Sequence, residues 1–369
     1  MKYYLVAGEA SGDLHGANLM QALKEQDQAA EFRYFGGPKM EAVAGTLVKH
    51  YKEMAFMGFT EVLLNLRTIF KNLSACKSDI LSYRPDAIIL IDFPGFNLKI
   101  AAFAKENNIP VYYYISPKVW AWNQKRVLKI KEKVDHMLCI LPFEVDFYAK
   151  WGMQVHYIGN PLLDEISRFQ KDDKFIAQQG LDTRPLIALL PGSRKQEIDR
   201  LLPEMATVAR SFPDCQFMLA ASPNFDTHYY QNLIGIAPIK IAVDQTYNIL
   251  AHAHAALVAS GTATLETAIF QVPQVVLYKG GAISIAIARL LVKIRFISLV
   301  NLIMDKAVVK ELIQEECNSI QIQTELSQLL AGPIREEMLE DYKELAVKLG
   351  KPGASQRAAQ IIYQSLDIA

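Results

Sequence analysis

The chain has 369 residues, more than one hydrophobic core usually supports, so roughly two domains are expected. Lysine plus arginine and aspartate plus glutamate number 39 each, so no overall charge favours a nucleic-acid partner. The four cysteines, Cys76, Cys139, Cys215 and Cys317, form no C-x-x-C pair, which argues against a zinc knuckle or disulfide framework and favours a reducing compartment.

The N-terminus predicts a β-strand and not an export signal. Its apolar run, residues 3–7, meets Gly8 and Glu9 too early for a secretory signal. The longest uncharged stretch, residues 245–265, contains histidines, hydroxyl residues and a glycine, so it predicts buried helix, strand and turn instead of a membrane span. We therefore expect a cytoplasmic protein.

Short apolar runs, typical of buried parallel strands, alternate with helical stretches. The first series comprises residues 3–7, 32–35, 87–91, 111–115 and 137–140. The second series comprises residues 186–190, 216–220, 240–242, 255–259 and 274–278. The two series predict two doubly wound, Rossmann-like α/β domains.

A polar segment with little apolar periodicity, residues 168–184, separates the two series. We place the domain boundary just before it, near Pro161. The expected parts are an N-terminal domain, residues 1–160, a C-terminal domain, residues 161–345, and a C-terminal helix able to cross back onto the first domain, residues 346–369.

The loops after the strands carry the candidate sites, because ligands of open α/β sheets bind outside the carboxyl ends of the strands. The first loop, Gly8 to Gly16, has small residues that let backbone approach a ligand and leave N–H groups for an anion. Ser11 and Gly12 are therefore candidate substrate contacts, and His15 has a side chain suited to proton transfer. A tight strand-to-helix turn without a ligand would have the same composition.

A carboxylate directly follows the run 87–91. Asp92 is a candidate general base if its surroundings raise its pKa toward neutrality, and Asn97 lies in the same segment as a candidate substrate contact. The alternative is a turn or cap residue, which is the commoner role of aspartate at a strand end.

Two loops of the second domain are suited to phosphate. In Gly192-Ser193-Arg194, Ser193 with Gln196 predicts a capping box at a helix start, and a guanidinium binds phosphate oxygens in a bidentate fork. An ordinary capped helix with a solvated arginine is the alternative.

The second of these loops, Ser260-Gly261-Thr262, leads into a helix that carries Glu266. Hydroxyl and backbone N–H groups bind phosphate, and a carboxylate can accept hydrogen bonds from two ribose hydroxyls. Close packing of a helix on a sheet would also select small residues.

These loops and their neighbours resemble the lipid-A-disaccharide synthase family. The resemblance rests on blocks that run in order over nearly the whole chain: Val6 to Asp13, Ile91 to Asn97, Ser116 to Trp122, Leu190 to Arg194, Ala259 to Ala263, Ser298 to Leu302 and Val309 to Cys317.

The resemblance implies a GT-B fold, in which the two domains face a cleft, and an inverting transfer that needs no metal or other cofactor. It implies that UDP-2,3-diacylglucosamine donates to the 6-hydroxyl of 2,3-diacylglucosamine 1-phosphate, giving UDP and the β-1,6-linked lipid A disaccharide 1-phosphate.

By position, the resemblance implies that Asp92 is the catalytic residue and that Arg194, Glu266 and Asn301 contact the donor. His15 departs from the apolar residue of other members, as Gly95 departs from an acidic one. His15 therefore stays an alternative base.

Acylated substrates imply peripheral contact with the cytoplasmic face of the inner membrane. Residues 57–73 place apolar side chains at helical spacing, and the candidates for membrane or acyl contact are Val62, Leu63, Leu66, Ile69 and Phe70. Residues 283–300 add Arg289, Lys293 and Arg295 to an apolar helix. For both segments the alternative is packing in the core.

Two tryptophans, Trp120 and Trp122, leave two roles open: stacking on sugar or lipid, or anchoring their own loop. Two other functions also remain open. A UDP-sugar 2-epimerase would act on the nucleotide sugar alone, and a non-catalytic binding protein would hold UDP without turnover. The oligomeric state is open, a homodimer included.

Overall fold

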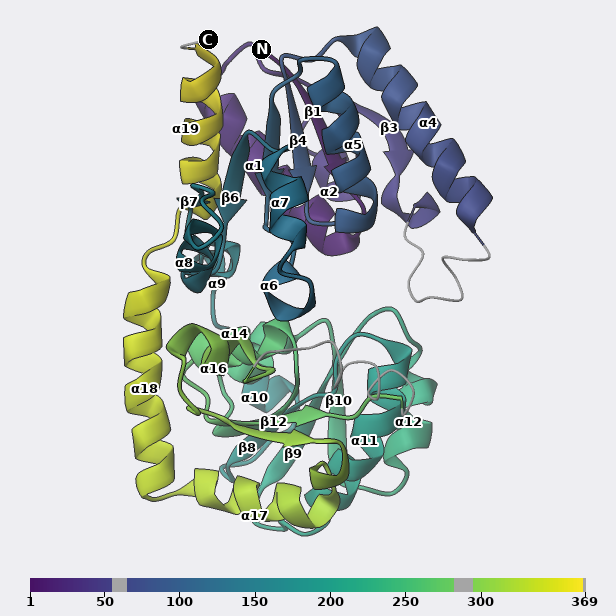
Figure 1. The fold of residues 1–369 in the computed structure, drawn as a ribbon. Helices are drawn as coiled ribbons and strands as arrows, with labels where there is room; N and C mark the ends of the chain where they lie inside the picture. Colours follow the sequence, from purple (N-terminus) through teal and green to yellow (C-terminus); the bar gives the residue numbers. More distant parts are fainter. Residues whose placement is uncertain (55–64, 282–294, 368–369) are drawn as a thin grey trace. The chain divides into compact units, whose positions relative to one another are not determined.

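The computed structural model describes residues 1–54, 65–281 and 295–367 (Figure 1). It divides into two compact units that we describe separately. Unit 1 comprises Met1–Asp164 with Lys351–Ala369, and unit 2 comprises Glu165–Gly350. Within the described ranges, no helix is long and apolar enough to cross a membrane.

Unit 1 contains a seven-stranded parallel sheet in the order β3-β2-β1-β4-β5-β6-β7. Its strands are β1 (Lys2–Ala7), β2 (Glu31–Gly36), β3 (Thr46–His50), β4 (Ala87–Ile91), β5 (Val111–Tyr114), β6 (His136–Cys139) and β7 (His156–Tyr157). Its helices are α1 (Ala10–Gln26), α2 (Pro38–Glu41), α4 (Leu66–Tyr83), α5 (Pro94–Glu106), α6 (Val119–Trp122), α7 (Arg126–Lys131), α8 (Phe143–Ala149) and α19 (Ala354–Asp367), with a 3-10 turn at Tyr51–Glu53. Helix α9 (Pro161–Arg168) spans the division between the units.

Both faces of this sheet are buried, because successive strand residues point to opposite faces and nearly all are apolar. On one face, Tyr4 and Leu90 pack with residues of α4, α5 and α7. On the other face, Leu5 and Ile91 pack with residues of α1 and of the C-terminal α19, which lies against α1. The side chain of Asp164 accepts hydrogen bonds from the first N–H groups of α19, so the chain end is fixed to unit 1.

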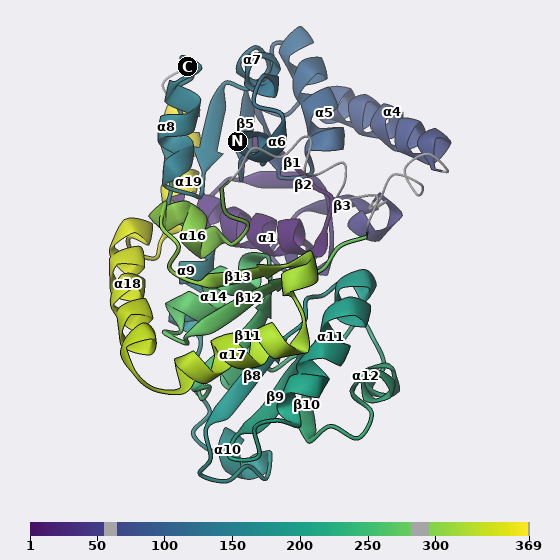
Figure 2. The same ribbon diagram turned by 60° about the horizontal axis from the view of Figure 1, so that its bottom comes forward.

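Unit 2 contains a six-stranded parallel sheet in the order β10-β9-β8-β11-β12-β13. Its strands are β8 (Leu186–Leu190), β9 (Gln216–Ala221), β10 (Ile239–Val243), β11 (Ala255–Ala259), β12 (Gln274–Tyr278) and β13 (Lys310–Ile313). Its helices are α10 (Phe175–Gln178), α11 (Lys195–Ala209), α12 (Thr227–Ile234), α13 (Thr246–Leu250), α14 (Thr262–Ile269), α16 (Leu299–Met304), α17 (Ser319–Leu330) and α18 (Pro333–Leu349), with a 3-10 turn at Gln314–Glu316. Figure 2 shows α11 and α17 side by side over this sheet.

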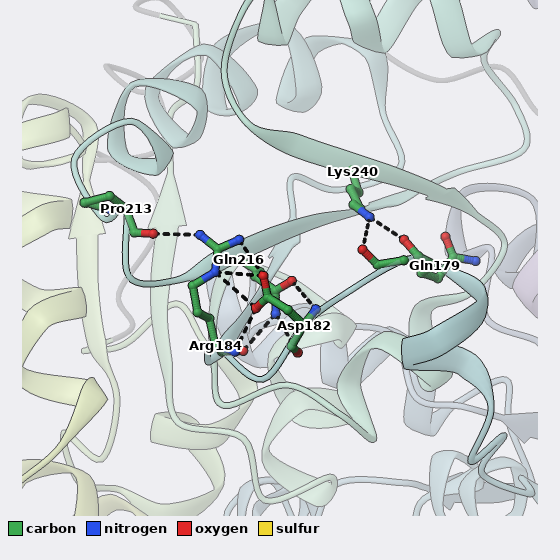
Figure 3. A network of polar contacts seen from close by, with 7 residues as sticks. Gln179, Asp182, Arg184, Pro213, Gln216 and Lys240 are labelled. Carbon is green, nitrogen blue, oxygen red and sulfur yellow. Dashed lines mark hydrogen bonds and ion pairs between the residues drawn. The ribbon is translucent and has the colours of Figure 1, made fainter.

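The amino ends of β8 and β9 are closed by a polar network (Figure 3). The amide of Gln216 accepts from the N–H of Asp182 at 2.8 Å and donates to the carbonyls of Asp182 and Arg184 at 3.1 and 2.9 Å. The guanidinium of Arg184 donates to the carboxylate of Asp182 and to the carbonyl of Pro213. The polar groups at this edge therefore bond to one another.

The prediction of two doubly wound α/β units is confirmed. All ten predicted strands are present, with ends shifted by at most one residue. Strands β3, β7 and β13 were not predicted, and each lies at an edge of its sheet.

Candidate active site

The strand order reverses once in each sheet. In unit 1 the reversal lies between β1 and β4, and in unit 2 it lies between β8 and β11. Ligands of open α/β sheets bind at such a point, outside the carboxyl ends. The segments after these four strands begin at Gly8, Asp92, Pro191 and Ser260, so they contain the loops singled out from the sequence.

Asp92 lies in a backbone turn that several hydrogen bonds fix. Asp92 and Phe93 both have φ of +46°, a left-handed conformation that costs about 1 kcal/mol or more for non-glycine residues. The Tyr113 hydroxyl donates to the Asp92 carbonyl at 2.6 Å. The Asn97 amide donates to three carbonyls, those of Val6 (3.2 Å), Ile91 (3.2 Å) and Asp92 (2.9 Å). The surrounding structure therefore sets the backbone that carries the Asp92 carboxylate.

The electrostatics of Asp92 suit a general base. Loss of hydration raises the pKa of this carboxyl above its usual value, the positive charge of Lys118 opposes the rise, and the negative charge of Glu9 adds to it. A higher pKa makes a carboxylate a stronger base, so this shift favours acceptance of a proton. Glu9 and Lys118 were not predicted as site residues, although both follow strands at the sheet edge that holds Asp92.

Asn97 lies inside unit 1. Its side chain is fully buried, and its amide donates to the three backbone carbonyls given above. Asn97 therefore holds the Asp92 turn, and its contact with substrate stays a prediction.

The small residues after β1 have packing reasons. A β-carbon at Gly8 would lie 2.3 Å from the Phe93 ring, and one at Gly12 would lie 3.2 Å from the Ala7 β-carbon. Helix α1 begins at Ala10, so the expected loop is short. Ser11 is exposed in the first turn, Gly12 is buried, and His15 is half-buried on the helix and not in a glycine-rich loop.

A buried carboxylate that the sequence did not reveal anchors the segment that carries Lys118. Glu144 accepts from the Trp120 indole N–H at 3.2 Å and from the Leu141 N–H at 3.0 Å. Burial raises the pKa of Glu144 to about 7. Trp120 also packs edge-on against Phe143 at 5.0 Å, so it anchors its loop. The side chain of Trp122 lies outside the described part of the structure.

Arg194 is the open group of the loop after β8. It is the N-cap of α11, its side chain is 66% exposed, and its nearest carboxylate contact is to Glu197 at 3.8 Å. Gly192 has φ of +98°, and a β-carbon there would lie 2.4 Å from the Glu197 carboxylate, so glycine is required. The predicted capping box is wrong, because the exposed Ser193 precedes the N-cap and Arg194 makes no side-chain cap.

The loop after β11 presents small groups at the start of a helix. Gly261 is the N-cap of the eight-residue α14, and Gly261 and Thr262 are exposed. The Ser260 hydroxyl donates to the Ile297 carbonyl at 3.1 Å. The first N–H groups of an α-helix lack intrahelical partners, so this loop offers donors to an anion.

Glu266 lies in a hollow of about 350 Å³ in unit 2. Burial raises the pKa of Glu266, and the Tyr247 hydroxyl donates to its carboxylate at 3.1 Å. The other lining residues are Phe169, Asp244, Gln245, Thr246 and Asn248. Sequence reasoning missed them, although residues 244–248 directly follow β10 and the strand-end rule would have selected them.

Asn301 lies in the interior of unit 2. Its amide N–H groups donate to the Val309 carbonyl and the Glu311 carboxylate, both at 2.9 Å. Its oxygen accepts from the N–H groups of Val308 and Val309. Asn301 is buried and these partners occupy its side chain, so it joins α16 to β13, and its contact with the donor stays a prediction.

The proposed membrane segment is described only from residue 65, so Val62 and Leu63 lie outside the described residues. Helix α4 begins at Leu66 and runs ten residues past the predicted segment. Leu66 and Phe70 are 40% and 60% exposed. Ile69 packs against the core, so the core alternative holds for this residue.

The basic segment is also only partly described. Arg289 and Lys293 lie outside the described residues, whereas Arg295 is exposed. The described residues contain no group of three or more histidine, cysteine, aspartate or glutamate side chains arranged to hold a metal ion.

Relatives of known name cover nearly the whole chain. A family model described as lipid-A-disaccharide synthetase matches residues 3–364. The lipid-A-disaccharide synthase of Syntrophus aciditrophicus is 41% identical over 364 residues, covering 96% of this chain and 95% of the relative. That of Myxococcus xanthus is 38% identical over 371 residues, covering 98% and 97%.

Solved structures with low identity share the fold. UDP-GlcNAc 2-epimerase from Neisseria meningitidis, bound to UDP-GlcNAc, has a TM-score of 0.68 at 14% identity and covers 100% of both chains. The kitacinnamycin glycotransferase has a TM-score of 0.69 at 14% identity and covers 99% of both chains. These likenesses confirm the GT-B fold class, and the family match and close relatives show that the chain belongs to the lipid-A-disaccharide synthase family, whose members are glycosyltransferases of lipid A disaccharide synthesis.

Proposed function

We propose that the chain transfers 2,3-diacylglucosamine from UDP-2,3-diacylglucosamine to the 6-hydroxyl of 2,3-diacylglucosamine 1-phosphate. The transfer inverts the donor's anomeric centre and gives the β-1,6-linked disaccharide 1-phosphate and UDP. The observation that carries this proposal is Asp92, a carboxylate with a raised pKa on a rigid turn at the switch point of unit 1.

Unit 2 takes the donor in this proposal. Arg194 and the first N–H groups of α11 and α14 suit a diphosphate, because cations and free helix N–H groups bind anions. The Glu266 carboxylate suits the ribose hydroxyls of the donor, and the hollow beside it has room for the uracil ring. Support comes from the Neisseria epimerase with the same fold, which binds UDP-GlcNAc.

Unit 1 takes the acceptor and supplies the base. Asp92 accepts the proton of the 6-hydroxyl while that oxygen bonds to C1 of the donor sugar. The bond from C1 to the phosphate oxygen breaks, and its electron pair leaves with UDP. Attack from the face opposite UDP accounts for inversion, and Arg194 stabilises the charge that develops on the leaving group. His15, which lies more than one turn after the start of α1 at Ala10, is the alternative base.

The acylated substrates place the reaction at the cytoplasmic face of the inner membrane. The exposed Leu66 and Phe70 of α4 are the described candidates for contact with acyl chains. Replacing both with serine is expected to lower binding to phospholipid vesicles without unfolding the protein, since neither side chain is buried. Unfolding would instead identify them as core residues.

The deciding experiment supplies UDP-2,3-diacylglucosamine with and without 2,3-diacylglucosamine 1-phosphate and follows UDP and disaccharide by mass spectrometry. Release of UDP that depends on the acceptor, with disaccharide formed, is the expected result. Conversion of the nucleotide sugar alone would indicate an epimerase, and binding of UDP without any product would indicate a binding protein.

A further inference from the structure

Unit 1 contains a hollow of its own, of about 620 Å³, on the α4–α5–α7 face of its sheet. We call it the basic groove. Five cationic side chains line it: Lys77 of α4, Lys99 of α5, Arg126 and Lys129 of α7, and Lys133 just after α7. Among the described residues that line it there is no aspartate or glutamate, in a chain whose total charge is zero. The basic groove is therefore a local concentration of positive charge.

The four lysines of the basic groove are not neutralised by carboxylates of the described residues. Among the described residues, Lys77, Lys99, Lys129 and Lys133 form no ion pair, whereas Lys105 of the same α5 pairs with Asp135 outside the groove. Like charges held together repel one another, and a bound anion removes that repulsion. The charge pattern thus favours an anionic ligand.

The floor of the basic groove is apolar. Phe70, Leu73 and Leu98 line it, and Phe70 is the most exposed of the three. The Lys99 ammonium lies 5.2 Å from the centre of the Phe70 ring, so charge and apolar surface adjoin at one place. A ligand that satisfies both needs an anionic group and a hydrocarbon chain.

One end of the basic groove is close to Asp92. Pro94 and Gly95, the first two residues of α5, line it, and Asp92 precedes Pro94 by only two residues. Two peptide units span about 7.6 Å at most, so the groove begins within about 8 Å of the Asp92 α-carbon. A β-carbon at Gly95 would meet nothing within 4 Å, which leaves this end open.

We infer that the basic groove binds the acceptor, with the lysines on its phosphate and the apolar floor against an acyl chain. The inference rests on the proposed function and adds the site of the acceptor's charged and acyl groups. A concave hollow of this size is typical of a single small-molecule ligand, whereas a bilayer surface is bound by an amphipathic helix that buries its apolar face at the interface.

Binding of 2,3-diacylglucosamine 1-phosphate and of its dephosphorylated counterpart, measured by calorimetry without donor, tests the inference. The groove variant is Lys77→Glu/Lys129→Glu. The matched control is Lys71→Glu/Lys131→Glu, which changes the same charge on the same two helices at exposed positions outside the groove. Thermal unfolding shows whether the Lys77→Glu/Lys129→Glu protein is folded. If it is not, Lys77→Gln/Lys129→Gln, which removes the two charges without reversing them, takes its place.

We expect wild type and control to prefer the phosphorylated lipid, and the groove variant to bind it about ten-fold or more weakly and lose the preference. An unchanged preference in the groove variant would overturn the inference. Binding to phosphatidylglycerol vesicles is measured for the same variants. A groove variant that loses vesicle binding but keeps its affinity for the phosphorylated lipid would also overturn the inference, because the groove would then be a membrane surface.

The proposed function can fail separately. If the groove variant loses lipid binding but wild type forms no disaccharide, the lipid site stands and the transferase proposal falls. If the groove variant forms disaccharide with an unchanged acceptor KM, the transferase proposal stands and the groove assignment falls.

Discussion

Strand β8 has an arginine near each end, and the two are in opposite situations. Arg184, just before the strand, donates to the Asp182 carboxylate and to the Pro213 carbonyl (Figure 3). Arg194, just after the strand, has among the described residues one carboxylate contact, with Glu197 at 3.8 Å. The same residue type is thus bonded within the protein at the amino edge of the sheet and open at the carboxyl edge.

The difference separates structural from chemical roles. At the amino edge, Gln216 has partners at both atoms of its amide. At the carboxyl edges, Asp92 has a raised pKa and Arg194 is open to solvent. Polar groups that already have partners stabilise the fold, whereas groups held without full compensation are available to a ligand.

If the carboxyl edge carries the chemistry, Asp92→Asn has the largest effect. Turnover is expected to fall by about 10²- to 10⁴-fold, the usual contribution of a general base. Thermal stability should change little, because Asn97 and Tyr113 bond to the backbone of Asp92 and not to its carboxylate.

The pH profile checks the role of Asp92. A base works when it is deprotonated, so wild-type kcat/KM should rise with pH through a pKa above the ordinary carboxyl value, and the Asn variant should lack this limb. His15→Ala is the comparison variant. Near-normal turnover in Asp92→Asn with loss in His15→Ala would reverse the assignment.

The open arginine is expected to matter for activity and the bonded one for the fold. Arg194→Ala should lower kcat/KM for the donor by about 10- to 100-fold, since a charge-assisted contact to phosphate contributes about 1.5–3 kcal/mol. Its unfolding temperature should stay unchanged, because the 3.8 Å contact with Glu197 is weak. Arg184→Ala is the matched variant, and an equal loss of activity in both would contradict the distinction.

Glu144 tests whether bonding or position decides the role of a polar group. It follows β6 near a carboxyl edge, yet both of its carboxylate oxygens accept hydrogen bonds within the protein. Glu144→Gln loses one acceptor for Trp120 or Leu141 and should lower the unfolding free energy by about 1–3 kcal/mol. In wild type the folded pKa of about 7 exceeds the unfolded one, so the folded state binds the extra proton.

The sign of the pH dependence follows from that proton. The contribution of Glu144 to stability is fully present below the unfolded pKa and is lost as pH rises through about 7. Urea unfolding of wild type from about pH 5, just above the ordinary carboxyl pKa, to about pH 8 should show the free energy of unfolding fall as pH rises. A Gln variant with the same slope would exclude Glu144 as its source.

The amino edge should behave in the opposite way. Gln216→Leu leaves the Asp182 N–H and two carbonyls without partners, and should lower the unfolding free energy by about 2 kcal/mol. Donor kcat/KM should remain close to wild type. A large loss of activity at unchanged stability would show that this edge also takes part in catalysis.

The sequence predicted the interior of each sheet better than its edges. A strand such as β4 is buried on both faces and is therefore a continuous apolar run. Edge strands have one neighbour: β3 is half-exposed and contains Lys49, and β7 has only two residues. Because these strands contain polar residues or are very short, a search for apolar runs does not find them.

The candidate loops could be predicted because they follow buried strands, but the role of each side chain could not. Asn97 bonds to the carbonyl of Val6, and Trp120 bonds to Glu144, 24 residues away. Asn301 bonds to Glu311 across the gap between α16 and β13. Such partners are set by the tertiary fold, so a local pattern shows the residue type without showing whether it is free.

The smallest expected effect concerns a single hydrogen bond at the open edge of unit 2. Tyr247→Phe removes the donor to Glu266 and should raise the donor KM about two- to five-fold, because a hydrogen bond contributes about 0.5–1.5 kcal/mol. The Tyr247 bond holds down the pKa of Glu266, so the loss should grow as pH falls and the carboxylate becomes protonated. Tyr4→Phe is the control, because its hydroxyl donates to the Asp79 carboxylate of unit 1, outside the hollow. Equal changes in donor KM for the two variants would remove Glu266 from the donor site, whereas a change confined to Tyr247→Phe would place the carboxylate against the bound donor.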